Sequence, residues 1–189
     1  MAVLVEAVSV IIRRNRIVSQ YPGGWKGFVA DCPNGTLCAD SDLARVGFMT
    51  PADVESFCHR LERCGLLFMR DGSAIDFSTV DQLRGPITHC EWLEYGHVDV
   101  DGHRVAACRL VGSEDAHVVT PDGWRYENSL SGGYGFVPTG ATNKSLAFLR
   151  HENGVDVYLN RLTGKEVYVG RTGELPLNAH DHDERRGNR

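Results

Sequence analysis

Six cysteines and eight histidines are the side chains of this 189-residue chain that invite metal or nucleophile chemistry. Cys32 and Cys38 enclose five residues, and so do Cys58 and Cys64. Zinc-binding pairs usually lie roughly two to four residues apart on a tight turn. Cys58 and Cys64 also fall on a predicted helix, where six positions correspond to about 600° of rotation and turn the thiols to different sides. We therefore expect no metal site and no other cofactor.

A cysteine acts as a nucleophile only with a base at hydrogen-bonding distance. The adjacent His89 and Cys90 do not qualify, because neighbours on an extended strand point to opposite faces. His97 and His103 flank a predicted hairpin turn, and Cys108 follows on the second strand. These last three residues are the candidates for catalysis, with the alternative that they are ordinary hairpin residues.

Two other patterns resemble catalytic or phosphate-binding motifs without completing them. The Asp40 and Asp42 carboxylates suit a turn held by hydrogen bonds from the side chains to the backbone. Glu91 and Glu94 suit a solvated strand face. The glycine-rich residues 132–145 lack the glycine directly before Lys144 that a P-loop requires.

Aromatic residues beside glycines and turns form the remaining candidate site. Large aromatics with a neighbouring arginine are typical of the residues that dominate protein interfaces. The alternative for Trp25 and Trp124 is that they anchor the core. The predicted binding residues are Tyr21, Trp25, Trp124, Arg125, Tyr126 and Tyr134.

The elements that position these residues fall into two predicted modules. In residues 1–72 the sequence predicts a buried strand at 3–12, helical turns broken at 22–24, strands at 36–39 and 43–49, a helix at 51–64 and a strand at 66–69. Thr50 and Pro51 are typical of a helix start. This order predicts an α+β fold that opens with a split βαβ, or ferredoxin-like, sandwich.

Residues 73–174 are predicted to form a mostly antiparallel β module. Asp101 and Gly102 supply the positive φ angles of a two-residue turn, which predicts a hairpin over 91–111. A terminal meander is expected within 146–170, after a glycine-rich loop at 131–143. Residues 175–189 are polar and lack periodicity, so a disordered tail is expected.

The composition restricts the class of protein. With 42% hydrophobic and 24% charged residues, the chain has an ordinary globular composition. The net charge of −5 argues against nucleic-acid binding. No apolar stretch approaches the ~20 residues of a membrane span, and no secretory signal is recognised at the N-terminus. We expect a cytoplasmic protein with reduced thiols. Its arginine-rich basic residues favour a GC-rich, bacterial source.

These observations predict a non-enzymatic, protein-binding role of a regulatory, adaptor or immunity type. Residues 71–189 hold twelve basic and eighteen acidic residues, which would suit a partner with a basic surface. The alternative is a small cofactor-independent enzyme with a cleft between the two modules. A third reading is a homo-oligomer that pairs through open sheet edges.

Overall fold

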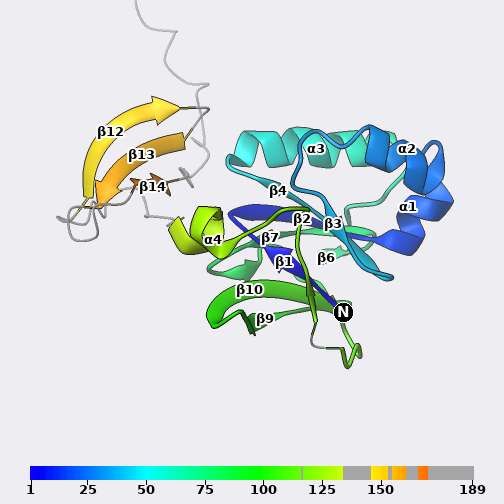
Figure 1. Cartoon of the computed structure of the whole chain (residues 1–189). Helices are drawn as coiled ribbons and strands as arrows, with labels where there is room; N and C mark the ends of the chain where they lie inside the picture. The colour runs from blue at the N-terminus through cyan, green and yellow to red at the C-terminus, as the bar shows by residue number, and fades with distance from the viewer. Residues whose placement is uncertain (116, 134–145, 153–154, 161–165, 170–189) are drawn as a thin grey trace, which may run out of the picture.

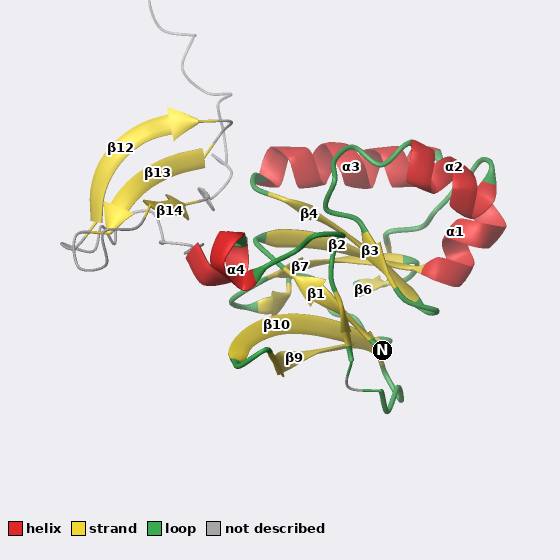
Figure 2. Ribbon diagram, in the orientation of Figure 1, coloured by secondary structure: helices red, strands yellow, loops and turns green. Residues whose placement is uncertain are grey.

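The structure is a computed structural model that describes residues 1–115, 117–133, 146–152, 155–160 and 166–169. It is an α+β fold in which helices cover one face of a five-stranded sheet, while a four-stranded sheet packs on the opposite face (Figure 1, Figure 2). The helices are α1 (Arg14–Gln20), α2 (Gly24–Ala30) and α3 (Pro51–Arg63). None of the described helices is long and apolar enough to cross a membrane.

The five-stranded sheet is antiparallel throughout, and its central strand is buried on both faces. Its strands, in spatial order, are β3 (Cys38–Ala39), β4 (Leu43–Phe48), β2 (Val8–Arg13), β7 (Phe77–Asp81) and β8 (Gly85–Pro86). The four-stranded sheet has the order β11 (Val118–Val119), β1 (Ala2–Val5), β10 (His103–Leu110) and β9 (Leu93–Val100).

Alternation along the strands divides the apolar residues between two cores. On β2, Val10 and Ile12 pack with the helices, whereas Ile11 packs with the second sheet. The same division places Val46 of β4 on the helix side and Leu43 on the other. Successive side chains of a strand point to opposite faces, so a strand that is apolar at nearly every position is suited to the middle of three layers.

The strand predicted at residues 3–12 is divided between the two sheets. Chain direction changes at Glu6 and Ala7, and Ala7 has a φ of 50°. The Ala7 N–H donates to Gln82 Oε1 at 2.8 Å, and the Gln82 N–H donates to the Ala7 carbonyl oxygen at 2.9 Å. This pair of hydrogen bonds fixes the crossing, because both backbone groups of Ala7 would otherwise be buried without partners.

The α+β class is confirmed, but the ferredoxin-like description of residues 1–72 is not. Strand β7, which lies beyond that module, pairs with β2, and β10 pairs with β1. Residues 66–69 do not pair with β2: the Asp76 and Ile75 N–H groups donate to the Leu67 and Phe68 carbonyls. The chain therefore turns back on itself through the short strands β5 (Met69–Arg70) and β6 (Ser73–Ala74) before β7 begins. Each of the two sheets contains strands from before and from after the predicted boundary near residue 72.

Two predicted elements are confirmed. Helix α3 starts at the cap Thr50, whose Oγ1 accepts a 3.2 Å hydrogen bond from the Asp53 N–H, and it is followed by Gly65 with a φ of 96°. In the β9–β10 hairpin, Asp101 and Gly102 have φ angles of 53° and 80°. Local turn and cap chemistry determines both elements.

The C-terminal strands form a separate three-stranded antiparallel sheet, as the predicted meander required. Its strands are β12 (Leu146–Glu152), β13 (Val155–Asn160) and β14 (Glu166–Val169). Before it lie the 3-10 turn η1 (Tyr126–Asn128) and the short α4 (Leu130–Gly133). Most of the loop predicted at 131–143, and the whole tail predicted at 175–189, lie outside the described residues.

The cap of α3 yields the first prediction. Replacing Thr50 with alanine removes the oxygen that accepts the Asp53 N–H, so the free energy of unfolding is expected to fall by about 1 kcal/mol. Urea denaturation followed by circular dichroism measures this change. Thr50→Ser is the control, because it keeps the hydroxyl. An equal loss with serine and alanine would contradict the capping role.

Candidate functional site

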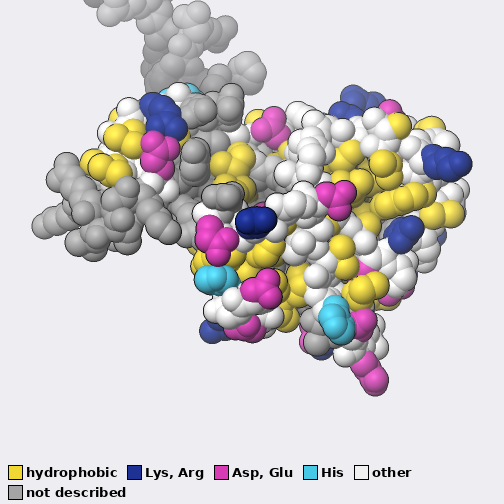
Figure 3. Space-filling view, viewed as in Figure 1, with side chains coloured by type: hydrophobic (Ala, Val, Ile, Leu, Met, Phe, Trp, Pro, Cys, Tyr) yellow, Lys and Arg dark blue, Asp and Glu magenta, His cyan; other side chains and the backbone are white. Residues whose placement is uncertain are grey.

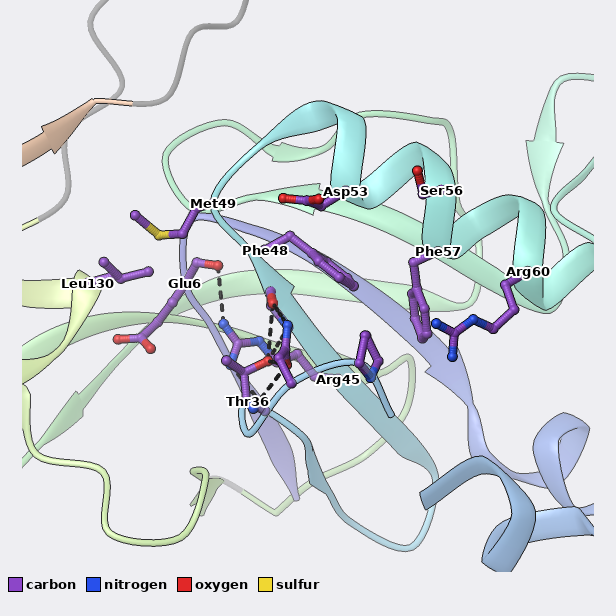
Figure 4. Close-up of a pocket in the computed structure, with 13 residues that line it drawn as sticks. Glu6, Thr36, Arg45, Phe48, Met49, Asp53, Ser56, Phe57, Arg60 and Leu130 are labelled. Atoms are coloured by element: carbon purple, nitrogen blue, oxygen red, sulfur yellow. Dashed lines mark hydrogen bonds between the residues drawn. The ribbon is translucent and has the colours of Figure 1, made fainter. Parts of the chain in front are cut away.

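A pocket of about 580 Å³ lies at the outer edge of β4, beneath the flank of α3 (Figure 4). Its walls come from four parts of the chain that are distant in sequence: the crossing at Glu6, the loop before β3, strand β4 with α3, and α4. The lining residues are Glu6, Pro33, Asn34, Thr36, Arg45, Gly47, Phe48, Met49, Asp53, Ser56, Phe57, Arg60 and Leu130.

The pocket exists because β3 covers only part of the β4 edge. Strand β3 pairs with Ala44 and Arg45 and no further along β4. Beyond it, the Gly47 N–H donates to Thr36 Oγ1 at 2.8 Å, and Asn34 Nδ2 donates to the Gly47 carbonyl oxygen at 2.9 Å. These side chains occupy the groups that a further strand would use, so the edge admits a side chain or a small molecule in preference to an added strand.

The Arg45 side chain forms the polar end of the pocket and is only 1% exposed. Its Nη1 donates to the Thr36 carbonyl at 3.2 Å and its Nη2 to the Glu6 carbonyl at 3.1 Å (Figure 4). Its Nε donates to Ser9 Oγ at 2.9 Å. All three acceptors are uncharged. Within the described part of the chain, no ion pair involves Arg45. A fully buried cation is thus held by neutral acceptors, with no carboxylate among its described hydrogen-bond partners.

Burial lowers the pKa of the Arg45 guanidinium, and the charges of the nearby Cys38 and Glu6 side chains act in the opposite direction. Burial likewise raises the pKa of the Cys38 thiol. An arginine keeps its proton in proteins even when its pKa falls. The site therefore holds a positive charge out of water, where an anion in contact would lower its free energy.

Gly47 makes room for this guanidinium. A Cβ atom built on Gly47 would lie 2.4 Å from Arg45 Nη2 and 2.7 Å from Cζ. The guanidinium cannot easily move aside, because its three hydrogen bonds hold it from three segments. A glycine at this position is therefore required by the close approach of the arginine.

The Glu6 carboxylate is bound elsewhere, although its carbonyl contacts Arg45. Glu6 Oε1 accepts hydrogen bonds from Trp124 Nε1 at 3.0 Å, from the Ser131 N–H at 3.0 Å and from Ser131 Oγ at 2.7 Å. These bonds tie the segment that leads to α4 onto the crossing between the sheets. Glu6 thereby links the pocket to the predicted binding residue Trp124.

The remaining walls are largely apolar. The rings of Phe48 and Phe57 lie 5.2 Å apart between their centroids, and the Arg60 guanidinium lies 5.9 Å from the Phe57 ring centroid. Asp53, Ser56 and Arg60 share one flank of α3, since they are three, four and seven positions apart. The pocket thus offers aromatic surface, one buried cation and a polar rim.

The predicted binding residues lie in two places. Tyr21 is 5% exposed and donates to Asp31 Oδ2 at 3.1 Å, and the Trp25 ring stacks on Phe28. Trp124 is half-buried and packs against the core between the two sheets, as Trp25 packs against the helix-side core. This packing agrees with the alternative that the tryptophans anchor the core.

The other members of that set are placed differently. Arg125 is exposed, and the Tyr126 ring stacks on His103 with 3.8 Å between the ring centroids. Tyr134 lies outside the described residues. The structure joins Trp124 to the pocket through Glu6, whereas Tyr21 lies at the end of α1 and Trp25 lies within α2. Binding by this set of residues stays a prediction.

The catalytic candidates are close in the hairpin without forming a catalytic pair. A hollow of about 200 Å³ is lined in part by His97 and Cys108. Yet Cys108 is 0% exposed, and burial raises the pKa of its thiol far above the usual range. Among the described residues, no hydrogen bond joins Cys108 to His97 or His103, and His103 instead lies 3.8 Å from Glu127.

The residues that form the pocket's polar end were not among the predicted site residues. Arg45, Glu6 and Gly47 nevertheless left a signal, because each interrupts an otherwise apolar strand sequence. A charged residue inside a strand that is buried on both faces needs a specific set of partners. This sequence pattern indicated that these positions have a specific structural or functional role.

The described residues contain no group of three or more His, Cys, Asp or Glu side chains arranged to hold a metal ion. A scan against models of protein families finds no match, and neither curated proteins nor solved structures give a significant match to this chain.

The contact between Arg45 and Gly47 yields the second prediction. We expect Gly47→Ala to lower the free energy of unfolding by roughly 1–3 kcal/mol, because the added methyl group overlaps the guanidinium. In an Arg45→Val background the same change should cost much less. Urea denaturation of both single variants and the double variant measures the coupling. Additive costs would contradict the close approach.

The burial of Cys108 yields the third prediction. Native protein treated with iodoacetamide at pH 8 should stay unmodified at Cys108, because the thiol is inaccessible and its pKa is raised. Peptide mass mapping checks this, with protein unfolded in urea as the positive control. Rapid labelling of Cys108 in the native protein would instead support the alternative of an enzyme.

Proposed function

We propose that this protein acts by binding another protein, in a regulatory, adaptor or immunity-type role, and that the pocket beside β4 holds an anchor group of that partner. The observation that carries the proposal is the composition of the pocket. Phe48 and Phe57 line one part of the pocket, and a buried cation that makes no ion pair among the described residues lines its other end. The described part of the pocket holds no nucleophile paired with a base.

The size and lining of the pocket suit an anchor residue. Small-ligand pockets usually span roughly 300–1,000 Å³, are mostly apolar and carry a few fixed polar groups. A pocket of about 580 Å³ with Phe48 and Phe57 on one side and Arg45 at its end has these properties. Interfaces concentrate their binding energy in a few such buried anchors.

Electrostatic attraction contributes in two ways: at long range, as the partner approaches, and inside the pocket, where the anchor group binds. The net charge of −5 favours the approach of a partner with a basic surface. Acidic and basic side chains are interspersed on the face seen in Figure 3, so no single strong patch directs the approach there. The buried cation acts only on the group that enters the pocket. The six free cysteines are in keeping with the proposed cytoplasmic location.

The fourth prediction tests the pocket directly. Ser56 lines it from the exposed flank of α3, so Ser56→Trp should place an indole across its mouth. Recovery of a specific partner from lysate of the source cells should fall at least about tenfold, which corresponds to about 1.4 kcal/mol. Tagged full-length protein and quantitative mass spectrometry measure the recovery.

Glu55→Trp is the matched control, because Glu55 is exposed on the other flank of the same helix and does not line the pocket. Circular dichroism and thermal unfolding verify that both variants fold. Equal recovery of every partner by the wild type and the two variants would contradict a role for the pocket.

A further inference from the structure

We propose that the pocket beside β4 recognises a carboxylate joined to an apolar group, with the Arg45 guanidinium as its counter-charge. The ligand to which the geometry points is the C-terminal residue of a partner chain, with an aromatic or aliphatic side chain. This inference rests on the proposed binding function and names the chemistry of the anchor.

The first step is the donor capacity of Arg45. A guanidinium has five N–H groups. Three of them donate to the oxygens of Ser9, Thr36 and Glu6, and the Cys38 thiol is a weak further acceptor. Donor capacity therefore remains on a side chain that lines the pocket and is held rigidly in place.

No described carboxylate is in direct contact with the Arg45 guanidinium. The carboxylate of Glu6, the nearest acidic residue on the pocket wall, already accepts from Trp124 and Ser131. Among the described residues, Arg45 itself donates to neutral oxygens and to the Cys38 thiol, and to no carboxylate. A carboxylate entering the pocket supplies the missing anion, and charge-assisted hydrogen bonds are stronger where water is excluded.

The rest of the ligand must match the apolar part of the pocket. Phe48 and Phe57 form an aromatic wall, and Met49, Leu130 and Pro33 add further apolar surface. An Asp or Glu side chain would bring the charge with almost no apolar surface. A chain that ends in phenylalanine or leucine brings both the carboxylate and the apolar group on one residue.

The last step is the number of charges on the ligand. Two arginines, Arg45 and Arg60, and two carboxylates, Glu6 and Asp53, line the pocket, so a ligand with two negative charges leaves a larger uncompensated charge than a ligand with one. A phosphate monoester carries about −1.5 to −2 at pH 7. This balance of charges therefore favours a carboxylate over a phosphate group.

The fifth prediction tests this chemistry with a matched pair of probes. N-acetylphenylalanine carries the carboxylate, and N-acetylphenylalaninamide replaces it with a neutral amide of the same size. In ¹H–¹⁵N spectra of the full chain, the acid should shift the Arg45 Nε–H resonance and the Gly47 amide resonance. Its Kd should be at least about tenfold lower than that of the amide.

Three further measurements test the site of binding, the kind of anion and the size of the ligand. Ser56→Trp should abolish the shifts caused by the acid, and Glu55→Trp should not. Phenyl phosphate should bind more weakly than N-acetylphenylalanine. A hexapeptide with C-terminal phenylalanine should bind more tightly than phenylacetate, and the reverse order would indicate a free small acid instead of a chain terminus.

The outcomes separate this inference from the function on which it rests. Equal affinity for the acid and the amide, or tighter binding of phenyl phosphate, would overturn carboxylate recognition. If neither probe nor the hexapeptide shifts the Arg45 resonance, the ligand class is wrong, whereas a loss of partner recovery with Ser56→Trp would still support the binding function. Partner recovery that is insensitive to Ser56→Trp would overturn the function itself.

Discussion

The buried guanidinium of Arg45 lies beside Glu6, where the chain passes from β1 in one sheet to β2 in the other. The surrounding architecture depends on this guanidinium. Its three hydrogen bonds reach the Glu6 carbonyl at the crossing, Ser9 on β2 and the Thr36 carbonyl in the loop before β3. Removing the partners of a buried charge, or the charge itself, leaves buried polar groups without hydrogen bonds and lowers the free energy of unfolding by several kcal/mol. A single side chain thus holds together the middle layer, the crossing and one pocket wall.

The crossing between the two sheets imposes one constraint that shapes both the fold and the proposed binding pocket. The crossing requires polar backbone groups in the interior, and Arg45 satisfies one of them from a strand whose glycine leaves space for it. Because Glu6 turns its carboxylate to Trp124 and Ser131, the charge of the arginine is not cancelled by direct contact. The same arrangement that stabilises the fold leaves a cation at the end of an apolar hollow.

The sequence was sufficient for elements that local chemistry determines. Thr50, Pro51 and Gly65 marked α3, and Asp101 with Gly102 marked the β9–β10 turn. It was insufficient where partners come from afar: the sequence did not indicate that β7 pairs with β2. The site was missed for the same reason, since the role of Arg45 depends on Glu6 and Ser9, which lie 39 and 36 positions away in the sequence.

The division of the first strand between two sheets bears on how the chain folds during synthesis. Residues Ala2–Val5 pair with β10, about a hundred positions later, and with β11 beyond that. The helix-covered sheet requires only residues up to β8, so it is complete on the ribosome while β1 still lacks its neighbours. Such non-local pairing slows folding and exposes an unpaired apolar edge to other nascent chains until residue 119 has emerged.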